Sequence, residues 1–190
     1  MVKGWAGRLV VVCIVLLLGG GCTRSRPGTT GAVPAVPTPI TGISPGNRGT
    51  AITGQTIYVP AYSHIYYQDR ERVINLTITL SIRNADPAQA IWIDSVQYHD
   101  ANGQLLRNEV SAAIQLPPLA TVEFVVEEED TSGGSGASFL VKWSSDLQPV
   151  APVVEAVMIS AASTQGISFV SVGRVIETVS ATPVAEGSGQ

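Results

Sequence analysis

The sequence predicts an all-β protein built as a single antiparallel β-sandwich. Residues 73–84 read VINLTITLSIRN, in which apolar and polar residues alternate strictly, as on a strand with one buried face. Short runs rich in β-branched and aromatic residues follow as far as residue 178, with turn residues between them. About seven or eight such strands favour an immunoglobulin-like sandwich, with a small closed barrel as the alternative.

The first 21 residues have the features of a secretory signal peptide. Two basic residues, Lys3 and Arg8, precede the apolar run LVVVCIVLLL at residues 9–18. A membrane-spanning helix needs about 20 apolar residues, so this run is too short to span a bilayer. It has the length of the hydrophobic region of a signal peptide, and we expect residues 1–21 to be removed.

The end of this segment resembles a bacterial lipoprotein signal. Three glycines, residues 19–21, lead directly into Cys22, although Gly19 stands where that pattern prefers leucine. The resemblance implies cleavage before Cys22, attachment of a lipid to its thiol and acylation of the new N-terminus, for example with palmitate. It also implies an outer-membrane destination in a Gram-negative cell, because Thr23 and not aspartate follows the cysteine. An ordinary signal peptide or an uncleaved anchor, with Cys22 incidental, is the alternative.

Charge and cysteine content limit the partners and the means of stabilisation. All 15 acidic residues lie beyond Cys22, whereas two of the 11 basic residues precede it, so the mature chain carries a net charge of about −6. Nucleic-acid binding depends on Lys and Arg that neutralise phosphates, so we expect no nucleic-acid partner. Cys13 would leave with the signal, and a single lipidated cysteine cannot form a disulfide within the domain.

Segments rich in small and polar residues flank the predicted domain. Residues 22–54 are rich in Thr, Pro and Gly and show no apolar periodicity, so we interpret them as a lipid-anchored, disordered linker. Residues 179–190 have a similar composition and are predicted to be a disordered tail. The sandwich domain is therefore expected at residues 55–178.

A tyrosine-rich stretch opens the domain. Residues 58–67 read YVPAYSHIYY and hold four of the five tyrosines. Pro60 would cost about 3 kcal/mol inside a helix, so the stretch is predicted to be extended, as an edge strand or at a bulge. Its outward face would present Tyr58, Tyr62, His64 and Tyr66 as a candidate binding surface. The alternative is that these rings cover one end of the sandwich.

The rest of the domain is predicted as further strands separated by turns. Asp86 and Pro87 end the long strand at residues 73–84, Asn102 and Gly103 suit a hairpin turn, and residues 133–136 form a glycine-rich loop. The two prolines at 117–118 exclude pairing in a sheet there. The expected strands are residues 90–99, 105–110, 121–127, 138–144, 153–160 and 167–178.

The sequence assigns no catalytic residue and implies no cofactor. It has none of the common spacings of zinc-binding or phosphate-binding motifs. An acidic run before the glycine-rich loop could offer oxygen ligands to a metal ion, with His64 or His99 as further ligands, or it could be a solvated turn. The candidate metal ligands in this run are Glu127, Glu128, Glu129 and Asp130.

Three segments together resemble the bacterial domain-of-unknown-function family 3124, small proteins that often carry lipoprotein signals. The segments are YVPAYSHIYYQDRERVINLTITLSIRN at residues 58–84, EEEDTSGGSGASFLVKW at 127–143 and VVEAVMISAASTQGISFVSVGRVI at 153–176. The likeness extends over about residues 55–176. It implies one cell-envelope domain, and it supplies no activity and no site residues, because the family has no assigned function.

The leading functional hypothesis is a lipid-anchored cell-envelope protein that binds a protein or glycan partner without catalysing a reaction. Membrane attachment through Cys22 and a sandwich held away from the bilayer by its linker are the features that favour it. A metal-assisted hydrolase of the envelope is the alternative, and a purely structural role in assembly is a third hypothesis. The sequence does not identify a ligand.

Overall fold

The computed structural model describes residues 49–161 and 166–180. The predicted signal peptide, Cys22, most of the linker and most of the tail lie outside these residues. The described chain forms twelve strands and one short 3-10 turn, η1 (Gly134–Gly136). The strands are β1 (Thr53–Pro60), β2 (His64–Tyr67), β3 (Asp69–Asn75), β4 (Thr77–Arg83), β5 (Ile91–His99), β6 (Leu105–Asn108), β7 (Ile114–Leu116), β8 (Thr121–Val126), β9 (Ser138–Ser145), β10 (Val153–Ser160), β11 (Ile167–Val172) and β12 (Arg174–Ser180).

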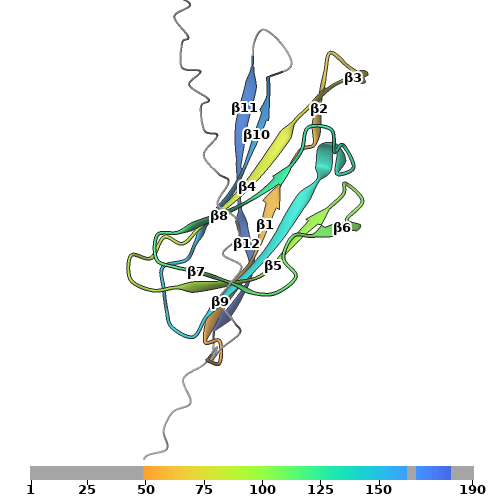
Figure 1. The fold of residues 1–190 in the computed structure, drawn as a ribbon. Helices are drawn as coiled ribbons and strands as arrows, with labels where there is room; N and C mark the ends of the chain where they lie inside the picture. The colour runs from red at the N-terminus through yellow and green to blue at the C-terminus, as the bar shows by residue number, and fades with distance from the viewer. Residues whose placement is uncertain (1–48, 162–165, 181–190) are drawn as a thin grey trace, which may run out of the picture. The chain divides into compact units, whose positions relative to one another are not determined.

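The strands form two main sheets and a separate hairpin (Figure 1). The six-stranded sheet has the order β12-β1-β9-β5-β6, with β7 paired beside β6 on the outer side of β5. The four-stranded sheet has the order β11-β10-β4-β8, and β2 and β3 pair only with each other. All of these pairs are antiparallel. The predicted all-β sandwich is confirmed.

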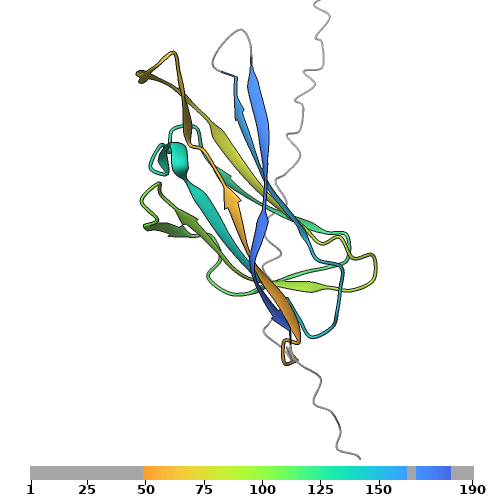
Figure 2. The ribbon, with the colours of Figure 1, turned by 180° about the vertical axis from the view of Figure 1, so that it is seen from behind.

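The immunoglobulin-like part of the prediction is not confirmed. Strand β1 lies between β12 and β9, and β10 pairs with β4, whereas immunoglobulin domains group their strands as ABED and CFG. Figure 2 shows β1, in orange, between the teal β9 and the dark blue β12.

Alternating apolar residues from both sheets fill the space between them. In β4 the even-numbered residues Ile78, Leu80 and Ile82 are fully buried, as the alternation predicted. The six-stranded sheet contributes Tyr98 and Phe139, whose rings lie 4.9 Å apart between centroids. Burial of large apolar side chains supplies the main stabilisation of the domain, since about 25 cal/mol is gained for each Å² removed from water.

The prediction of a single strand at residues 73–84 is wrong, because β3 ends before Leu76 and β4 begins after it. Strand β3 pairs with β2, whereas β4 pairs with β8 and β10 in the four-stranded sheet. The amide of the fully buried Leu76 donates to the carbonyl of Ser63 at 2.9 Å, so the backbone changes partners at this residue. The alternation of apolar and polar residues gives no sign of this change, because the apolar residues that turn toward the core have even numbers both before and after Leu76.

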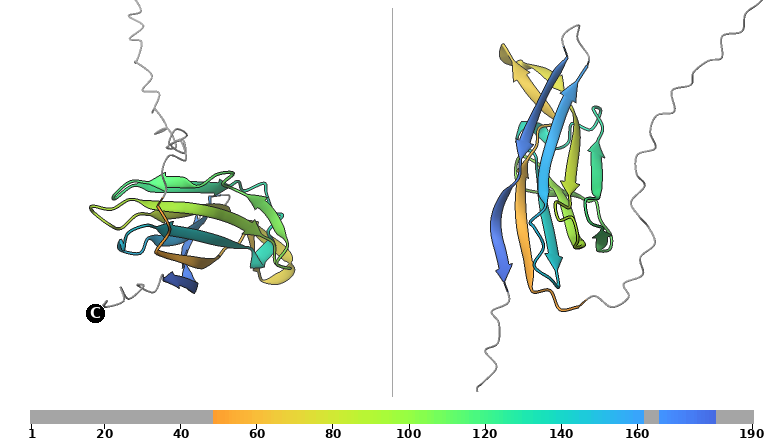
Figure 3. Two further views of the ribbon diagram at one scale, coloured as in Figure 1. Left: turned by 90° about the horizontal axis from the view of Figure 1, so that it is seen from below. Right: turned by 90° about the vertical axis from the view of Figure 1, so that its left-hand side faces the viewer.

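The strand predicted at residues 167–178 also divides, at Gly173. Strand β11 belongs to the four-stranded sheet and β12 to the six-stranded one, and the two follow each other along one side of the domain (Figure 3). A Cβ atom at Gly173 would lie 2.8 Å from the carbonyl oxygen of Val154 and 2.7 Å from a methyl group of Ile57. Glycine is therefore needed where the chain crosses between the sheets.

The prediction of an edge strand around Pro60 is wrong, because β1 is an inner strand. Pro60 ends β1 opposite Ser138 of β9, whereas the pairing with β12 extends only to Tyr58. The proline therefore lies beyond the last residue of β1 that pairs with β12. Its missing N–H removes no hydrogen bond between these two strands. The short strand β7 was not predicted at all.

A buried polar cluster fixes the loops at one end of the sandwich. The amide nitrogen of Asn84 donates to the carbonyl oxygens of Gln89, Leu116 and Pro117 at 2.8, 3.1 and 2.9 Å. Asp86 accepts backbone N–H bonds from three residues, namely Val150, Ala88 and Gln89, each at 2.8 Å. These bonds, led by the one from Val150, lower the pKa of Asp86.

Candidate functional site

The β2–β3 hairpin is the best candidate for a functional site among the described residues. Residues Tyr66↔Val73 and Ile65↔Ile74 face each other across it, and the register shifts between Tyr66 and Tyr67. Gln68 occupies the turn with a φ of 65°, in the left-handed region. The hairpin therefore has a tight tip with a backbone conformation that bulky residues rarely adopt.

Local hydrogen bonds hold the tip of the hairpin. One carboxylate oxygen of Asp69 accepts the backbone N–H groups of Glu71 and Arg72, both at 3.0 Å. The guanidinium of Arg72 pairs with the other oxygen of Asp69 at 3.5 Å and also donates to the side-chain oxygen of Gln68. An aspartate that bonds its own following backbone is a common turn stabiliser.

The root of the hairpin is attached to the sandwich. Ser63 is fully buried, and its N–H and hydroxyl both donate to the carbonyl oxygen of Gly134, at 3.0 and 3.2 Å. Ile65 and Ile74 are partly buried and pack against the core. The hairpin is thus fixed at its base while its tip extends into solvent.

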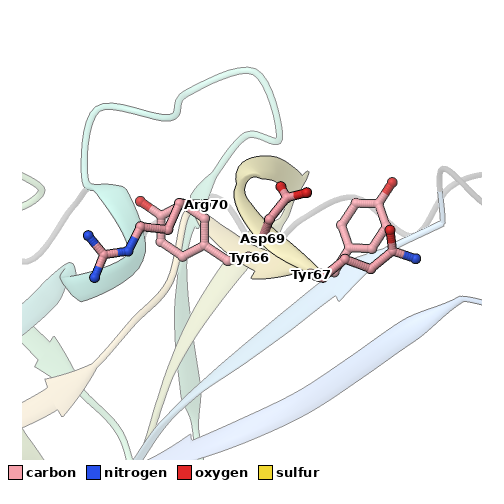
Figure 4. Close-up of a pocket in the computed structure, with 5 residues that line it drawn as sticks. Tyr66, Tyr67, Asp69 and Arg70 are labelled. Carbon is pink, nitrogen blue, oxygen red and sulfur yellow. The ribbon is translucent and has the colours of Figure 1, made fainter.

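Two tyrosines are exposed near the tip, on opposite sides of the hairpin. Tyr66 is 52% exposed and Tyr67 is 44% exposed. Figure 4 shows Tyr66 beside Arg70 on one side of the turn, Tyr67 on the other side and Asp69 between them. The ring of His64 meets that of Tyr66 edge to face, with 5.3 Å between centroids. A large exposed ring that packs against a second ring, as Tyr66 does against His64, is suited to contact a binding partner.

Two open hollows lie beside these tyrosines. The first has a volume of about 570 Å³ and is lined by residues 66–70 at the tip. The second, of about 510 Å³, lies between the hairpin and the end of the β10–β11 pair, and Tyr67 borders both hollows. The second hollow is lined by Tyr67, Val73, Ile74, Asn75, Glu128, Ser160 and Ile167. Its volume lies within the range of small-molecule sites, and its lining is mostly apolar with a few polar groups.

The four residues of the predicted aromatic surface do not form one stripe. Tyr58 lies on β1 in the six-stranded sheet, and Tyr62 is half-buried with its ring 5.7 Å from that of Phe169. Only His64 and Tyr66 lie on the hairpin. Prediction from the sequence missed Tyr67, Gln68 and Arg70 as members of the site. It did place a charged turn at residues 69–72, next to the turn that the structure has at Gln68.

The acidic run forms a turn after β8. The backbone N–H of Asp130 donates to the carbonyl of Glu127 at 3.0 Å, while Glu128 accepts a bond from Ser160 at 3.3 Å beside the second hollow. Asp130 pairs with Arg107 at 3.1 Å, and its bonds from Ser132 and from Arg107 lower its pKa. Within residues 49–161 and 166–180, no three His, Cys, Asp or Glu side chains gather closely enough to hold a metal ion.

The second histidine lies on a different element, in the six-stranded sheet. His99 ends β5, and its Nδ1 lies 3.2 Å from the carbonyl oxygen of Gly103 in the β5–β6 turn.

In the part of the chain that the structure describes, no helix is long and apolar enough to cross a membrane.

The fold and the hairpin define an antiparallel β-sandwich protein with an exposed aromatic site. Residues 54–176 match the family described as "Protein of unknown function (DUF3124)". The chain therefore belongs to this family, which confirms the resemblance found in the three sequence segments.

Two further comparisons add little to this assignment. No match was found among curated proteins. A structure described as "Crystal Structure of Thermotoga maritima 1070" is 10% identical with a TM-score of 0.39, and the match covers 63% of this chain and 92% of the other. A likeness at that level carries no argument about fold or function.

Proposed function

We propose that this protein is a lipid-anchored binding module of the cell envelope that uses the β2–β3 hairpin to hold a protein partner. The observation that carries the proposal is the exposure of Tyr66 and Tyr67 on opposite sides of an anchored hairpin, next to two open hollows. A glycan is the second class of ligand that the exposed rings would suit.

The residue types at the tip favour a protein over a glycan. Tyr and Arg are enriched among the residues that dominate protein–protein binding, and Tyr66 lies beside Arg70 (Figure 4). Asp69 and Glu71 add charge of the opposite sign at the same tip. Charges of both signs around a small apolar centre resemble the rim and core of a protein interface.

The anchor part of the proposal is supported by the sequence alone. The apolar run at residues 9–18 and the glycines before Cys22 suit a lipoprotein signal, and an outer-membrane location follows if the cell is Gram-negative. Replacement of Cys22 by serine in the full-length chain tests it. We expect the parent to incorporate labelled palmitate and to sediment with membranes, and we expect the variant to do neither. Equal labelling of both chains would refute the anchor.

The binding part is tested by crosslinking in native envelopes. The full-length parent is compared with a Tyr66→Ala, Tyr67→Ala double variant and with Tyr58→Ala, which removes an exposed tyrosine on a different strand. Loss of an interface tyrosine typically costs about 2 kcal/mol, or about thirtyfold in affinity. We expect one protein band to disappear in the double variant only, with unchanged melting curves for all three chains.

Other outcomes have distinct meanings. A band that persists in the double variant, or that disappears equally in Tyr58→Ala, would contradict the assignment of the hairpin. A crosslinked product that is digested by glycan hydrolases and resists protease would replace the protein partner with a glycan.

A further inference from the structure

Strand β12 forms one edge of the six-stranded sheet and carries an unusual set of exposed side chains. Among the described strands it pairs only with β1. Val175, Ile176 and Val179 are 50%, 60% and 54% exposed. An exposed edge strand with apolar side chains is a template for pairing with another strand.

The two charged residues of β12 lie on the same face of the sheet. Arg174 is paired with Tyr58 and Glu177 with Thr56, and Tyr58 and Thr56 are two residues apart on β1. Residues two apart on a strand share a face, and so do residues directly opposite each other. The hydroxyl of Thr56 donates to the Glu177 carboxylate at 3.0 Å, which agrees with this placement.

A β-bulge explains why two residues three positions apart share a face. In a regular strand, residues 174 and 177 would point to opposite sides. The register with β1 shifts between Thr56 and Ile57, so β12 has one extra residue between Glu177 and Val175. The extra residue is Ile176, and it restores Arg174 and Glu177 to one face.

We propose that β12 pairs antiparallel with β12 of a second copy of this chain, which joins two six-stranded sheets across a two-fold axis between the Val175–Ile176 segments. In this register Arg174 of each copy lies opposite Glu177 of the other copy. Because the axis is perpendicular to the joined sheet, the two charged pairs form on the same face. Val175 of each copy lies at the axis, with the extra residue Ile176 next to it in the chain.

The charges select this register over its neighbours. If Glu177 faced Glu177, or Arg174 faced Arg174, like charges would lie directly opposite each other, which destabilises a strand pair. Charged residues on an edge usually discourage pairing. Here they have opposite signs on one face, so they disfavour the registers with like charges and stabilise the one in which Arg174 meets Glu177. This self-complementarity identifies a second copy as the occupant of the edge.

Charge reversal in the full-length, detergent-solubilised chain tests the proposal by analytical ultracentrifugation. Arg174→Glu and Glu177→Arg each convert two attractive pairs into two repulsive ones, and each should weaken dimerisation by at least about tenfold. The double variant, Arg174→Glu with Glu177→Arg, restores both pairs with reversed sign and should return to within about threefold of the parent. Melting curves show whether each variant is folded.

Cysteine crosslinking in intact envelopes gives a second, position-specific measurement. Val175 occupies the paired position midway between Arg174 and Glu177, so it lies on the axis. Cysteines in place of Val175 would meet across the axis at about 5 Å, within reach of a disulfide. Cysteines in place of Val179 would lie about 20 Å apart along the strands, because each is three paired positions from the axis. We expect oxidation to link Val175→Cys and not Val179→Cys, with the parent chain as the control for its own cysteines.

Four results would overturn the proposal. The parent could be monomeric at every concentration, the single reversals could dimerise as well as the parent, or Val179→Cys could crosslink as well as Val175→Cys. A disulfide from Val175→Cys to another envelope protein, without a dimer of this chain, would also assign the edge to a different partner and refute the second copy.

Discussion

A methyl group added at Gly133 should test how the glycine-rich loop packs on the core. The backbone of Gly133 has a φ of −70° and a ψ of −28°, which alanine adopts without strain, so any cost must come from contact. An ideal Cβ there would lie 2.0 Å from the hydroxyl oxygen of Tyr98, 2.7 Å from its Cζ atom and 2.7 Å from the Cβ of Ala137.

The ring of Tyr98 has little freedom to move away. It is fully buried, its centroid is 4.9 Å from that of Phe139, and the guanidinium of Arg107 lies 5.4 Å from the ring centre. Burial, with a further contribution from Asp130, raises the pKa of Tyr98 to about 12, so its hydroxyl stays protonated. Overpacking a core costs about 1 to 3 kcal/mol, and we expect Gly133→Ala to cost about 3 kcal/mol because the closest contact is so short.

A double-mutant cycle separates the two contacts. Apart from the Ser63 side chain, which acts to lower its pKa, the Tyr98 hydroxyl has no hydrogen-bond partner among the described residues, so Tyr98→Phe alone should change the free energy of unfolding by less than about 1 kcal/mol. In the Tyr98→Phe background the contact at 2.0 Å is gone while those at 2.7 Å remain. Gly133→Ala should then cost at least about 1 kcal/mol less than it does in the parent.

Urea denaturation of the four full-length chains measures this coupling. A loss of about 3 kcal/mol would also lower the melting temperature by roughly 10 °C. If Gly133→Ala were neutral in the parent, the loop could not pack as described. If its cost were the same in both backgrounds, the hydroxyl of Tyr98 would not be the obstacle.

Three further predictions concern the sheet crossing and the buried polar cluster. Gly173→Ala should destabilise the domain by about 2 to 3 kcal/mol in urea denaturation, because its Cβ would meet a backbone oxygen that cannot rotate away, and a neutral result would contradict the crossing geometry. Asn84→Ala should cost about 2 to 4 kcal/mol, because three carbonyl oxygens lose their donor; a cost under 1 kcal/mol would mean that water replaces the amide. The pKa of Asp86 is lowered on folding from its usual 3.8, so its bonds stabilise the fold above that pH, and this contribution is lost as the pH falls through the lower, folded pKa. The stability advantage of the parent over Asp86→Asn should therefore shrink as urea denaturation is repeated from pH 7 to about pH 2, and a constant advantage would refute the role of the charge.

The sequence predicted the strands best where one face of the strand is buried and the other is exposed to solvent. Strand β10 coincides with the predicted residues 153–160, and β5 and β8 differ from their predictions by one residue at an end. The turns at Gly103 and at the prolines 117–118 also lie between strands. These features depend on residues close together in the chain, so local patterns suffice to predict them.

The site was only partly predictable because it is assembled from distant segments. The tyrosine-rich stretch indicated an exposed aromatic surface, and the hairpin does expose Tyr66. The stretch gave no sign that the chain bends at Ser63, which separates Tyr58 and Tyr62 from the hairpin. The second hollow also needs Glu128 and Ile167, which lie far along the chain from Tyr67.

The alternation of apolar and polar residues by itself determined the β class, the buried face of each strand and the short turns, since these depend on a period of two and on turn chemistry. The leader composition likewise produced the expectation of a lipid anchor at Cys22. The tertiary structure alone decided where strands leave one sheet for another, because alternation continues unchanged through Leu76 while the hydrogen-bond partners change. It also decided which residues share the exposed edge, since the bulge at Ile176 reverses the face that spacing alone would assign.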